Sequence, residues 1–341
     1  MNEPIFIARQ DTLEQEILPA HWLSQYKLFG EESYTFQDKE IWKKLCMSRA
    51  AVNDRDMHAE ALEEMLTTFS AEHTGKWMLL VYGMDAAVLE GLVTMAAIAA
   101  NGTAMAAVAG NALLMHAITN SQTAMRAIAN SQTAMHAIAN SETAMQRIAN
   151  STTAMDAIGG SKIARDAVQA SPYYDAKIKE NDMAIAKLVV GFANLESARY
   201  SGCAGMAADS TAMTAVAASS TAMTAVAASA TAMGKIAAVD AALSKLAAST
   251  TAMDALYARK KQMKGGSASK SGKFIILEIS QSNAFNTSKY GYATLSDGSK
   301  PDWSSYLAKY AFFRKYPKYA TYMLNDTDSD DYIYYFDIAS P

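Results

Sequence analysis

A twelve-residue segment near the end of the chain has the side chains of a cation site. Its positions 1, 3, 5 and 12 are acidic and are occupied by Asp326, Asp328, Asp330 and Asp337. This spacing follows the ligand order of a calcium-binding loop, in which carboxylate oxygens surround the ion. Asp331, however, replaces the glycine that the sharp turn of such a loop requires. Two interpretations therefore remain, a Ca²⁺ site and a solvated acidic turn between two strands.

A second group of residues has the side chains that bind sugars or phosphate-bearing lipopolysaccharide. Its members are Trp303, Tyr306, Tyr310, Arg314 and Lys315. Aromatic rings offer flat apolar faces with polar edges, and guanidinium and ammonium groups pair with phosphates. The competing interpretation is that most of the rings form a buried core or a subunit interface. Because Trp303 and Tyr306 stand beside a predicted turn at residues 298–302, we expect these two to be exposed.

No catalytic set of residues accompanies these groups. The five histidines are scattered along the chain, and the sequence has no nucleophile motif, phosphate loop or zinc-ligand spacing. The paired carboxylates that glycoside hydrolysis requires are also missing. We therefore predict that the protein is not an enzyme, that it has no catalytic residues, and that it needs no cofactor besides the Ca²⁺ considered above.

The element that must position these groups is a ten-residue repeat. Methionine recurs every ten residues from Met95 to Met155, and a branched apolar residue follows each methionine after three positions. The pattern continues in weaker form to Leu195, and a second clear block runs from Met213 to Leu256. Met213 comes two residues too early for the first block, so the phase breaks near residues 202–205. The two glycines there suit a joint between two arrays.

Each unit of the repeat predicts one short helix, for which residues 121–130 serve as the example. Ser121 is a good N-cap because its hydroxyl can accept a hydrogen bond from a free amide of the first turn. Asn130 can end the helix in the left-handed conformation. At 100° per residue, one face of the helix consists of Ala124, Met125, Ile128 and Ala129. The variable position after each methionine therefore faces solvent.

Three architectures remain for the array. A continuous helix would turn its Met/Ile face by about 80° per repeat, because ten residues in three turns give about 3.3 residues per turn. This drift favours short stacked helices over a continuous supercoiled bundle. The alanine-rich units disfavour the third architecture, a β-solenoid. Because one unit is too small to bury its own face, we expect neighbouring units and other copies of the chain to complete the core.

Composition excludes several classes of protein. The 341 residues carry a net charge of −4, which gives no reason to expect nucleic-acid binding. Two distant cysteines, Cys46 and Cys203, do not form a disulfide framework, so assembly in a reducing cytosol is the simplest interpretation. The first residues do not resemble a secretory signal. The most apolar window, residues 78–100, contains Asp85 and Glu90, so we expect it to start the array rather than to insert into a membrane.

The predicted fold is mainly α, an elongated array of ten-residue helical repeats between two small end domains. Residues 1–80 form a helical head for docking or oligomerisation. The first array covers residues 81–201 and is degenerate after 160, and the second covers 202–258. A flexible Gly/Ser/Lys linker at 259–273 leads to an aromatic-rich, β-containing tip at 274–341. In the tip we expect strands at 274–280, 290–295 and 332–338 and a helix at 304–313.

The repeated phrases NSQTAMRAIA and STAMTAVAAS resemble the TAMxAIAxSx decapeptide arrays of bacteriophage tail-fibre and tail-associated proteins. The resemblance covers about residues 95–158 and 210–256. It implies a structural virion protein that is made in the host cytoplasm and is usually a homotrimer. It also implies that the N-terminal part docks on tail or baseplate proteins and that the C-terminal tip meets a glycan or protein of the host surface. The head matches no docking module of this family, and the tip is short for a receptor-binding domain.

Two other functions remain open at this point. The chain could be a collar or baseplate adaptor, or a spacer, whose C-terminal domain binds another virion protein. It could also be a bacterial surface adhesin, although the missing secretion signal and anchor count against that function.

Overall fold

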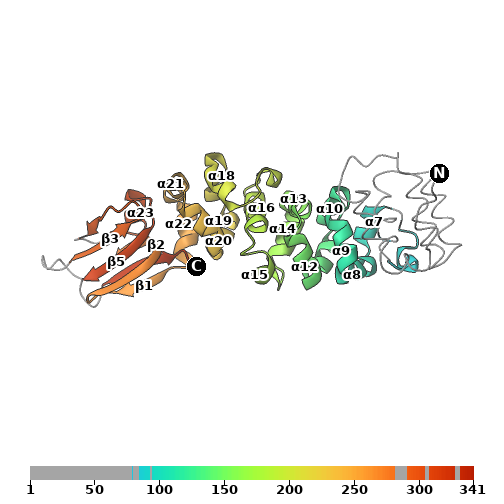
Figure 1. Ribbon diagram of the computed structural model, residues 1–341, viewed down its shortest axis with the longest axis horizontal. Coiled ribbons are helices and arrows are strands. Elements are labelled where there is room, and N and C mark those ends of the chain that lie inside the picture. Colours follow the sequence, from blue (N-terminus) through green and yellow to red (C-terminus); the bar gives the residue numbers. More distant parts are fainter. Residues whose placement is uncertain (1–78, 80–83, 93, 281–289, 304–306, 327–330) are drawn as a thin grey trace, which may run out of the picture. The chain divides into compact units, whose positions relative to one another are not determined.

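The computed structural model describes residues 79, 84–92, 94–280, 290–303, 307–326 and 331–341, and Figure 1 shows its helices and strands. The chain divides into two compact units, Met1–Lys177 and Ile178–Pro341. The predicted class is confirmed, because the described residues are mainly helical and carry a small antiparallel sheet at the C-terminal end. Almost all of the predicted head, residues 1–80, lies outside the described residues.

Each register of the first array forms one short helix. Among the described residues of this unit the helices are η3 (Ala86–Leu89), α7 (Met95–Ala100), α8 (Gly102–Gly110), α9 (Ala112–Thr119), α10 (Gln122–Ala129), α11 (Gln132–Ala139), α12 (Glu142–Ala149), α13 (Thr152–Gly160), α14 (Lys162–Gln169) and α15 (Tyr174–Lys177). Consecutive helices meet at sharp corners, as the bend of 102° between α8 and α9 shows. Short stacked helices, rather than a continuous bundle or a β-solenoid, are therefore the architecture of the array.

The buried face of each helix is the one that the periodicity predicts. In α10, Ala124, Met125, Ile128 and Ala129 are at most 2% exposed, whereas Arg126 in the variable position is exposed. The methionines of the other clear registers are buried in the same way. Because a single chain already buries these side chains, the repeat core needs no second copy to complete it. The expectation that other copies must cover this face is wrong.

Each helix packs on the helix that comes three places later in the chain. Thus α7, α10 and α13 form one column, α8, α11 and α14 a second, and α9, α12 and α15 a third. Three consecutive helices therefore make one coil of about thirty residues. A residue has its structural equivalent in the next coil about thirty positions later, so residues far apart in the sequence become neighbours within a column.

In most repeats of the first array from Ser131 onward, a serine at the start of the helix joins one coil to the preceding one. The hydroxyl of Ser131 accepts a hydrogen bond from the amide of Ala134 at 3.2 Å and donates one to the carbonyl of Ala99 at 2.6 Å. The same donation to a carbonyl thirty-two residues earlier occurs at Ser141, Ser151, Ser161, Ser171 and Ser249. One small side chain thus caps its own helix and ties it to the preceding coil.

Asn130 does not end its helix in the left-handed conformation, so that prediction is wrong. Its φ and ψ are −95° and 0°, and Asn140 and Asn150 are similar. Ser131 follows at once in an extended conformation and caps the next helix. Two residues therefore make the whole corner, and a residue with positive φ is not needed. The Asn140 side chain instead donates to the carbonyl of His136 at 2.9 Å and satisfies a group at the end of the helix.

The second unit begins with a joint and continues as a second array. Its helices are α16 (Asp182–Phe192), η4 (Ser197–Arg199), α17 (Cys203–Ala208), α18 (Ser210–Ala218), α19 (Ser220–Ala228), α20 (Ala230–Ala237), α21 (Asp240–Ala248) and α22 (Thr250–Ala258). In α17, Cys203 stands where the repeat has its methionine and Met206 where it has its branched apolar residue. Both are fully buried. The second array therefore starts one register before Met213. The first pattern does not hold as far as Leu195, because Ala198 is exposed in η4.

The phase break near residues 202–205 is confirmed, and sterics explain why residue 202 is a glycine. A Cβ atom on Gly202 would lie 2.3 Å from a carboxylate oxygen of Asp182. The other oxygen of Asp182 accepts a hydrogen bond from the amide of Cys203 at 3.2 Å. A side chain of α16 thus caps the start of α17, and only glycine leaves room for it.

Glu180 caps a distant helix in the same unit. Its carboxylate accepts hydrogen bonds from the amides of Ala230 at 3.1 Å and Thr231 at 2.8 Å, at the N-terminus of α20. Burial by itself would raise the pKa of this carboxyl group, but the hydrogen bonds from Thr231 and Ala230 outweigh it and lower the pKa. A lowered pKa means that the contact stabilises the fold above the ordinary pKa of glutamate and is lost as the pH falls through the lowered value.

We predict that Glu180→Gln destabilises the second unit at pH 7 by roughly 1 kcal/mol, a value discounted for the exposure of the side chain. The difference from the wild type should shrink as the pH falls from 7 through the lowered pKa of Glu180, because the wild-type carboxyl group is then protonated. Hydrogen exchange of the amides of residues 230–232, measured across this pH range, checks the prediction. Glu196→Gln is the control, since this exposed residue makes no side-chain cap bond. Equal protection in both variants at pH 7 would contradict the assigned role.

The C-terminal part of the second unit is one antiparallel sheet with a short helix. The strands are β1 (Lys261–Lys264), β2 (Ala268–Ser280), β3 (Tyr290–Leu295), β4 (Asp302–Trp303), β5 (Ala320–Asp326) and β6 (Tyr332–Asp337), in the order β1-β6-β2-β5-β3-β4. The three predicted strands are confirmed, and β1, β4 and β5 were not predicted. Of the predicted helix at 304–313, residues 304–306 lie outside the described residues, and α23 covers only Ala311–Lys315.

The predicted flexible linker at 259–273 is wrong. These residues form β1, a turn with positive φ at Gly266 and Ser267, and the first half of β2. Met263 is buried between exposed neighbours, and residues 268–271, of which all but Ala268 are polar, pair with β5. β1 is an edge strand and the first half of β2 is largely exposed, and composition alone does not distinguish such polar strands from a linker.

Within the described residues, no single helix is long and apolar enough to cross a membrane. Two pairs of helices, α8 with α9 and α18 with α19, reach the required length only together, and they are bent by 102° and 101°.

Candidate functional site

Trp303, expected to be exposed, is a core residue. It is 2% exposed and packs edge-on against Phe312, with ring centroids 5.6 Å apart. A Cβ atom on Gly291 would lie 2.3 Å from the indole nitrogen, so the glycine of the neighbouring strand makes room for the ring. The prediction of an exposed indole is therefore wrong. Tyr306, its predicted companion, lies outside the described residues.

Tyr310 and Arg314 lie at the contact between the sheet domain and the last repeat helix. Tyr310 is 5% exposed, and its hydroxyl donates to the carboxylate of Asp254 in α22. Lys309 also contacts Asp254, at 3.2 Å, and Arg314 donates to the hydroxyl of Thr250 at 3.1 Å. These side chains attach the domain to α22. Lys315, by contrast, is exposed.

Two further contacts strengthen this attachment. Tyr257 of α22 donates a hydrogen bond of 2.5 Å to Glu278 on β2. Lys318 pairs at 2.7 Å with Asp240 of α21. The C-terminal domain is therefore bound directly to the end of the second array. The structure therefore separates the described members of the predicted sugar-binding group. Trp303 lies in the core, Tyr310 and Arg314 contact α22, and Lys315 is exposed.

The structure does not bring the two described acidic residues of the predicted calcium loop together. Asp337 pairs across the sheet with Phe274, whereas Asp326 follows Asn325, the partner of Ala268. The two carboxylates therefore lie roughly 20 Å or more apart along β2, too far to bind one ion. Asp337 instead lies 3.5 Å from Lys261. Asp328 and Asp330 lie outside the described residues.

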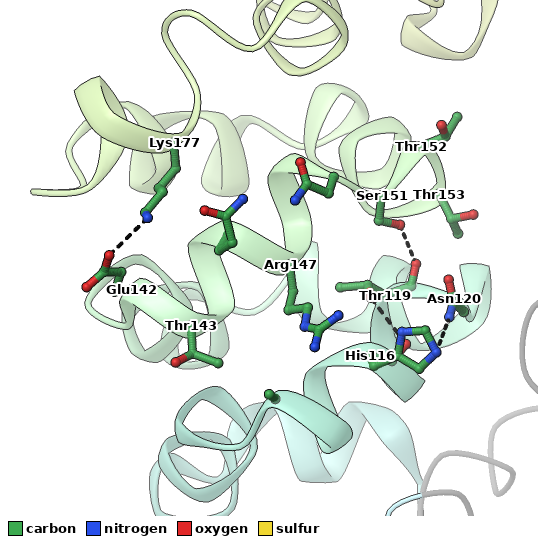
Figure 2. Close-up of a pocket in the computed structure, with 13 residues that line it drawn as sticks. His116, Thr119, Asn120, Glu142, Thr143, Arg147, Ser151, Thr152, Thr153 and Lys177 are labelled. Carbon is green, nitrogen blue, oxygen red and sulfur yellow. Dashed lines mark hydrogen bonds and ion pairs between the residues drawn. The ribbon is translucent and has the colours of Figure 1, made fainter. Parts of the chain in front are cut away.

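The first unit contains a polar groove of about 720 Å³ on the column of α9, α12 and α15, as Figure 2 shows. One wall comes from α9 and the other from α12 and the start of α13, and Lys177 of α15 closes one end. Its lining consists of Ala112, His116, Thr119, Asn120, Glu142, Thr143, Gln146, Arg147, Asn150, Ser151, Thr152, Thr153 and Lys177. Almost all of these side chains carry a hydrogen-bonding group.

The groove forms where the sequence departs from the repeat. Arg147 stands at a position that is alanine in every other helix from α7 to α14. Lys177 occupies the same position one coil later, thirty residues along the chain. Thr119 also replaces an alanine, and its carbonyl accepts the coil-joining hydrogen bond from Ser151 at 2.6 Å. Sequence analysis missed this site, although comparing each repeat with the third one after it would have aligned Arg147 with Lys177.

The two ends of the groove differ in charge. At one end Lys177 and Glu142 form an ion pair of 2.9 Å, in which the lysine is 19% exposed. At the other end Arg147 faces His116 in Figure 2, and among the described residues its guanidinium has no hydrogen-bond or ion-pair partner. Burial, and then the charge of Arg147, lower the pKa of His116. The histidine is therefore neutral at pH 7, and Arg147 provides a positive charge that the groove does not neutralise.

This arrangement can bind and orient a ligand but offers no nucleophile with an activating base. The side chain of Asn120 lies 3.3 Å from His116 Nε2 and holds the ring in place. The groove is thus a candidate binding site rather than a candidate active site. The chain matches no protein-family model and no curated protein, so the function has to be argued from these contacts.

Proposed function

We propose that this chain is a structural virion protein, a phage tail fibre or fibre-like appendage whose arrays act as spacers. The main support is the regular bonding of the repeats, in which every tenth residue from Ser131 to Ser171, and Ser249 in the second array, donates to the carbonyl thirty-two residues earlier. The repeat methionines are also completely or almost completely buried. Such repeats add length through identical contacts and place no chemistry in the core.

The decapeptide phrase supplies the second support, since it resembles those of phage tail proteins. Under this proposal the N-terminal head docks on tail or baseplate proteins and the C-terminal domain meets a host-surface glycan or protein. A homotrimer would have to form through surfaces other than the Met/Ile faces, which the chain covers by itself. Light scattering of the purified chain tests the trimer, and a mass equal to that of one 36.7 kDa chain would exclude it.

One observation favours the alternative, a collar or baseplate adaptor. Tyr310 and Arg314, which were expected to contact a host glycan, are engaged with Asp254 and Thr250 of the same chain. If this domain only caps the array, host recognition has to lie elsewhere and the domain could serve assembly.

Removing residues 261–341 distinguishes the two functions. The deletion starts at Lys261 because β1 belongs to the sheet. A fibre predicts intact particles that fail to adsorb to host cells, whereas an adaptor predicts that particles fail to assemble. Particles that both assemble and adsorb normally would contradict both functions. Electron microscopy of particles that carry a label at the C-terminus of the full chain shows where the protein resides.

A further inference from the structure

We propose that the groove on α9, α12 and α15 binds a carboxylated saccharide, whose carboxylate is held by Arg147. This inference concerns the purified chain and does not depend on its place in a virion.

Arg147 gives the groove a positive charge for a ligand to match. The other charged side chains of the groove, Lys177 and Glu142, neutralise each other at 2.9 Å. Arg147 replaces an alanine that would suffice for packing, and its guanidinium reaches into the groove in Figure 2. A guanidinium presents its donors in a planar fork that matches the two oxygens of a carboxylate. One anionic group is therefore the expected partner.

The uncharged part of the lining is almost entirely polar. Threonine hydroxyls and the amides of Asn120, Asn150 and Gln146 both donate and accept hydrogen bonds, as the hydroxyl groups of a sugar do. Ala112 is the one wholly apolar side chain in the lining. A peptide would need apolar pockets for its side chains, which this lining does not offer. The polar surface thus favours a saccharide over an acidic peptide.

The size of the groove suits a small organic ligand. The volume of about 720 Å³ lies within the range of roughly 300–1,000 Å³ for sites that bind small organic molecules. A small inorganic anion would fill only a fraction of it. Glu142 of the ion pair lies five residues before Arg147 on α12, about 7–8 Å along the helix axis, so a ligand of two sugar rings can reach from the guanidinium toward the ion pair.

The test uses the full chain and three carboxylated probes, namely trigalacturonate, a hyaluronan tetrasaccharide and sialyllactose. Calorimetry measures binding, and nuclear magnetic resonance of the histidine side chains reports on His116. We expect at least one probe to bind and to raise the pKa of His116, because a bound carboxylate offsets the charge of Arg147. Maltotriose, which is neutral, should bind at least tenfold more weakly.

Two matched variants locate the binding. Arg147→Ala restores the residue found at this position in the neighbouring repeats, so it should fold, and it should weaken binding at least tenfold. Lys235→Ala removes a positive charge at the same repeat position of α20, in the other unit, and should leave binding unchanged.

Several results would overturn the proposal. These are the absence of any shift at His116 with all three probes, unchanged affinity in Arg147→Ala, equal binding of maltotriose, and tighter binding of a hexaglutamate peptide or of inorganic phosphate than of the saccharides.

Discussion

Met135→Ala is expected to destabilise the first array by about 2–5 kcal/mol. Met135 is completely buried in α11, which packs on α8 and on α14 within one column. Alanine would leave a cavity that both neighbouring coils line, and the surrounding helices are tied by their serine bonds and cannot close on it freely. Few single changes in this chain should cost more.

The loss should be local, because each repeat interacts mainly with its neighbours. Hydrogen exchange should therefore show faster opening of α8, α11 and α14 than of α12 and α13. His136→Ala is the control, since His136 is adjacent in sequence but exposed, and its effect should stay within about 0.5 kcal/mol. Uniform loosening of all helices would contradict the column arrangement.

Ser131→Ala is expected to destabilise the array by roughly 2–4 kcal/mol, the second largest effect. The change removes an N-cap, which costs about 0.5–2 kcal/mol. It also removes the donor to the Ala99 carbonyl, which costs about 1–3 kcal/mol when the acceptor stays buried. Urea denaturation followed by circular dichroism, together with hydrogen exchange in α7 and α11, measures the loss.

Two companion variants separate the contributions of Ser131. Glycine caps a helix nearly as well as serine, so Ser131→Gly should keep the loss that belongs to the bond between coils. Gln132→Ala changes an exposed neighbour and should have little effect. If Ser131→Gly is as stable as the wild type, the 2.6 Å contact contributes little and the serine acts only as a cap.

The sequence predicts the individual repeat helix well, because its causes are local. The spacing of Met125 and Ile128 defines the buried face, and Ser121 caps the start, as the structure confirms. The coil of three helices was not predictable in the same way. It depends on the corner angle, which follows from the backbone conformations of Asn130 and Ser131 together with the contact to Ala99. The groove follows from that coil, so it too was missed.

The C-terminal domain shows which features of a sheet the sequence predicts and which it does not. Strands rich in apolar residues, such as Tyr290–Leu295, were found from their composition. The polar strand Lys261–Lys264 was taken for part of a linker, because pairing with β6 rather than its own composition makes it a strand. Trp303 was expected to be exposed, since nothing in the sequence shows that Gly291 lies beneath its ring.

Because three helices make one coil, the column in which a helix lies depends on how many decapeptides precede it. Loss or gain of one decapeptide would preserve every helix but move all later side chains to the next column, so that α9 would no longer meet Arg147. Loss or gain of three decapeptides would restore the frame and change only the number of coils. Length in this protein can therefore vary without loss of surface pattern in steps of about thirty residues, although the sequence repeats every ten.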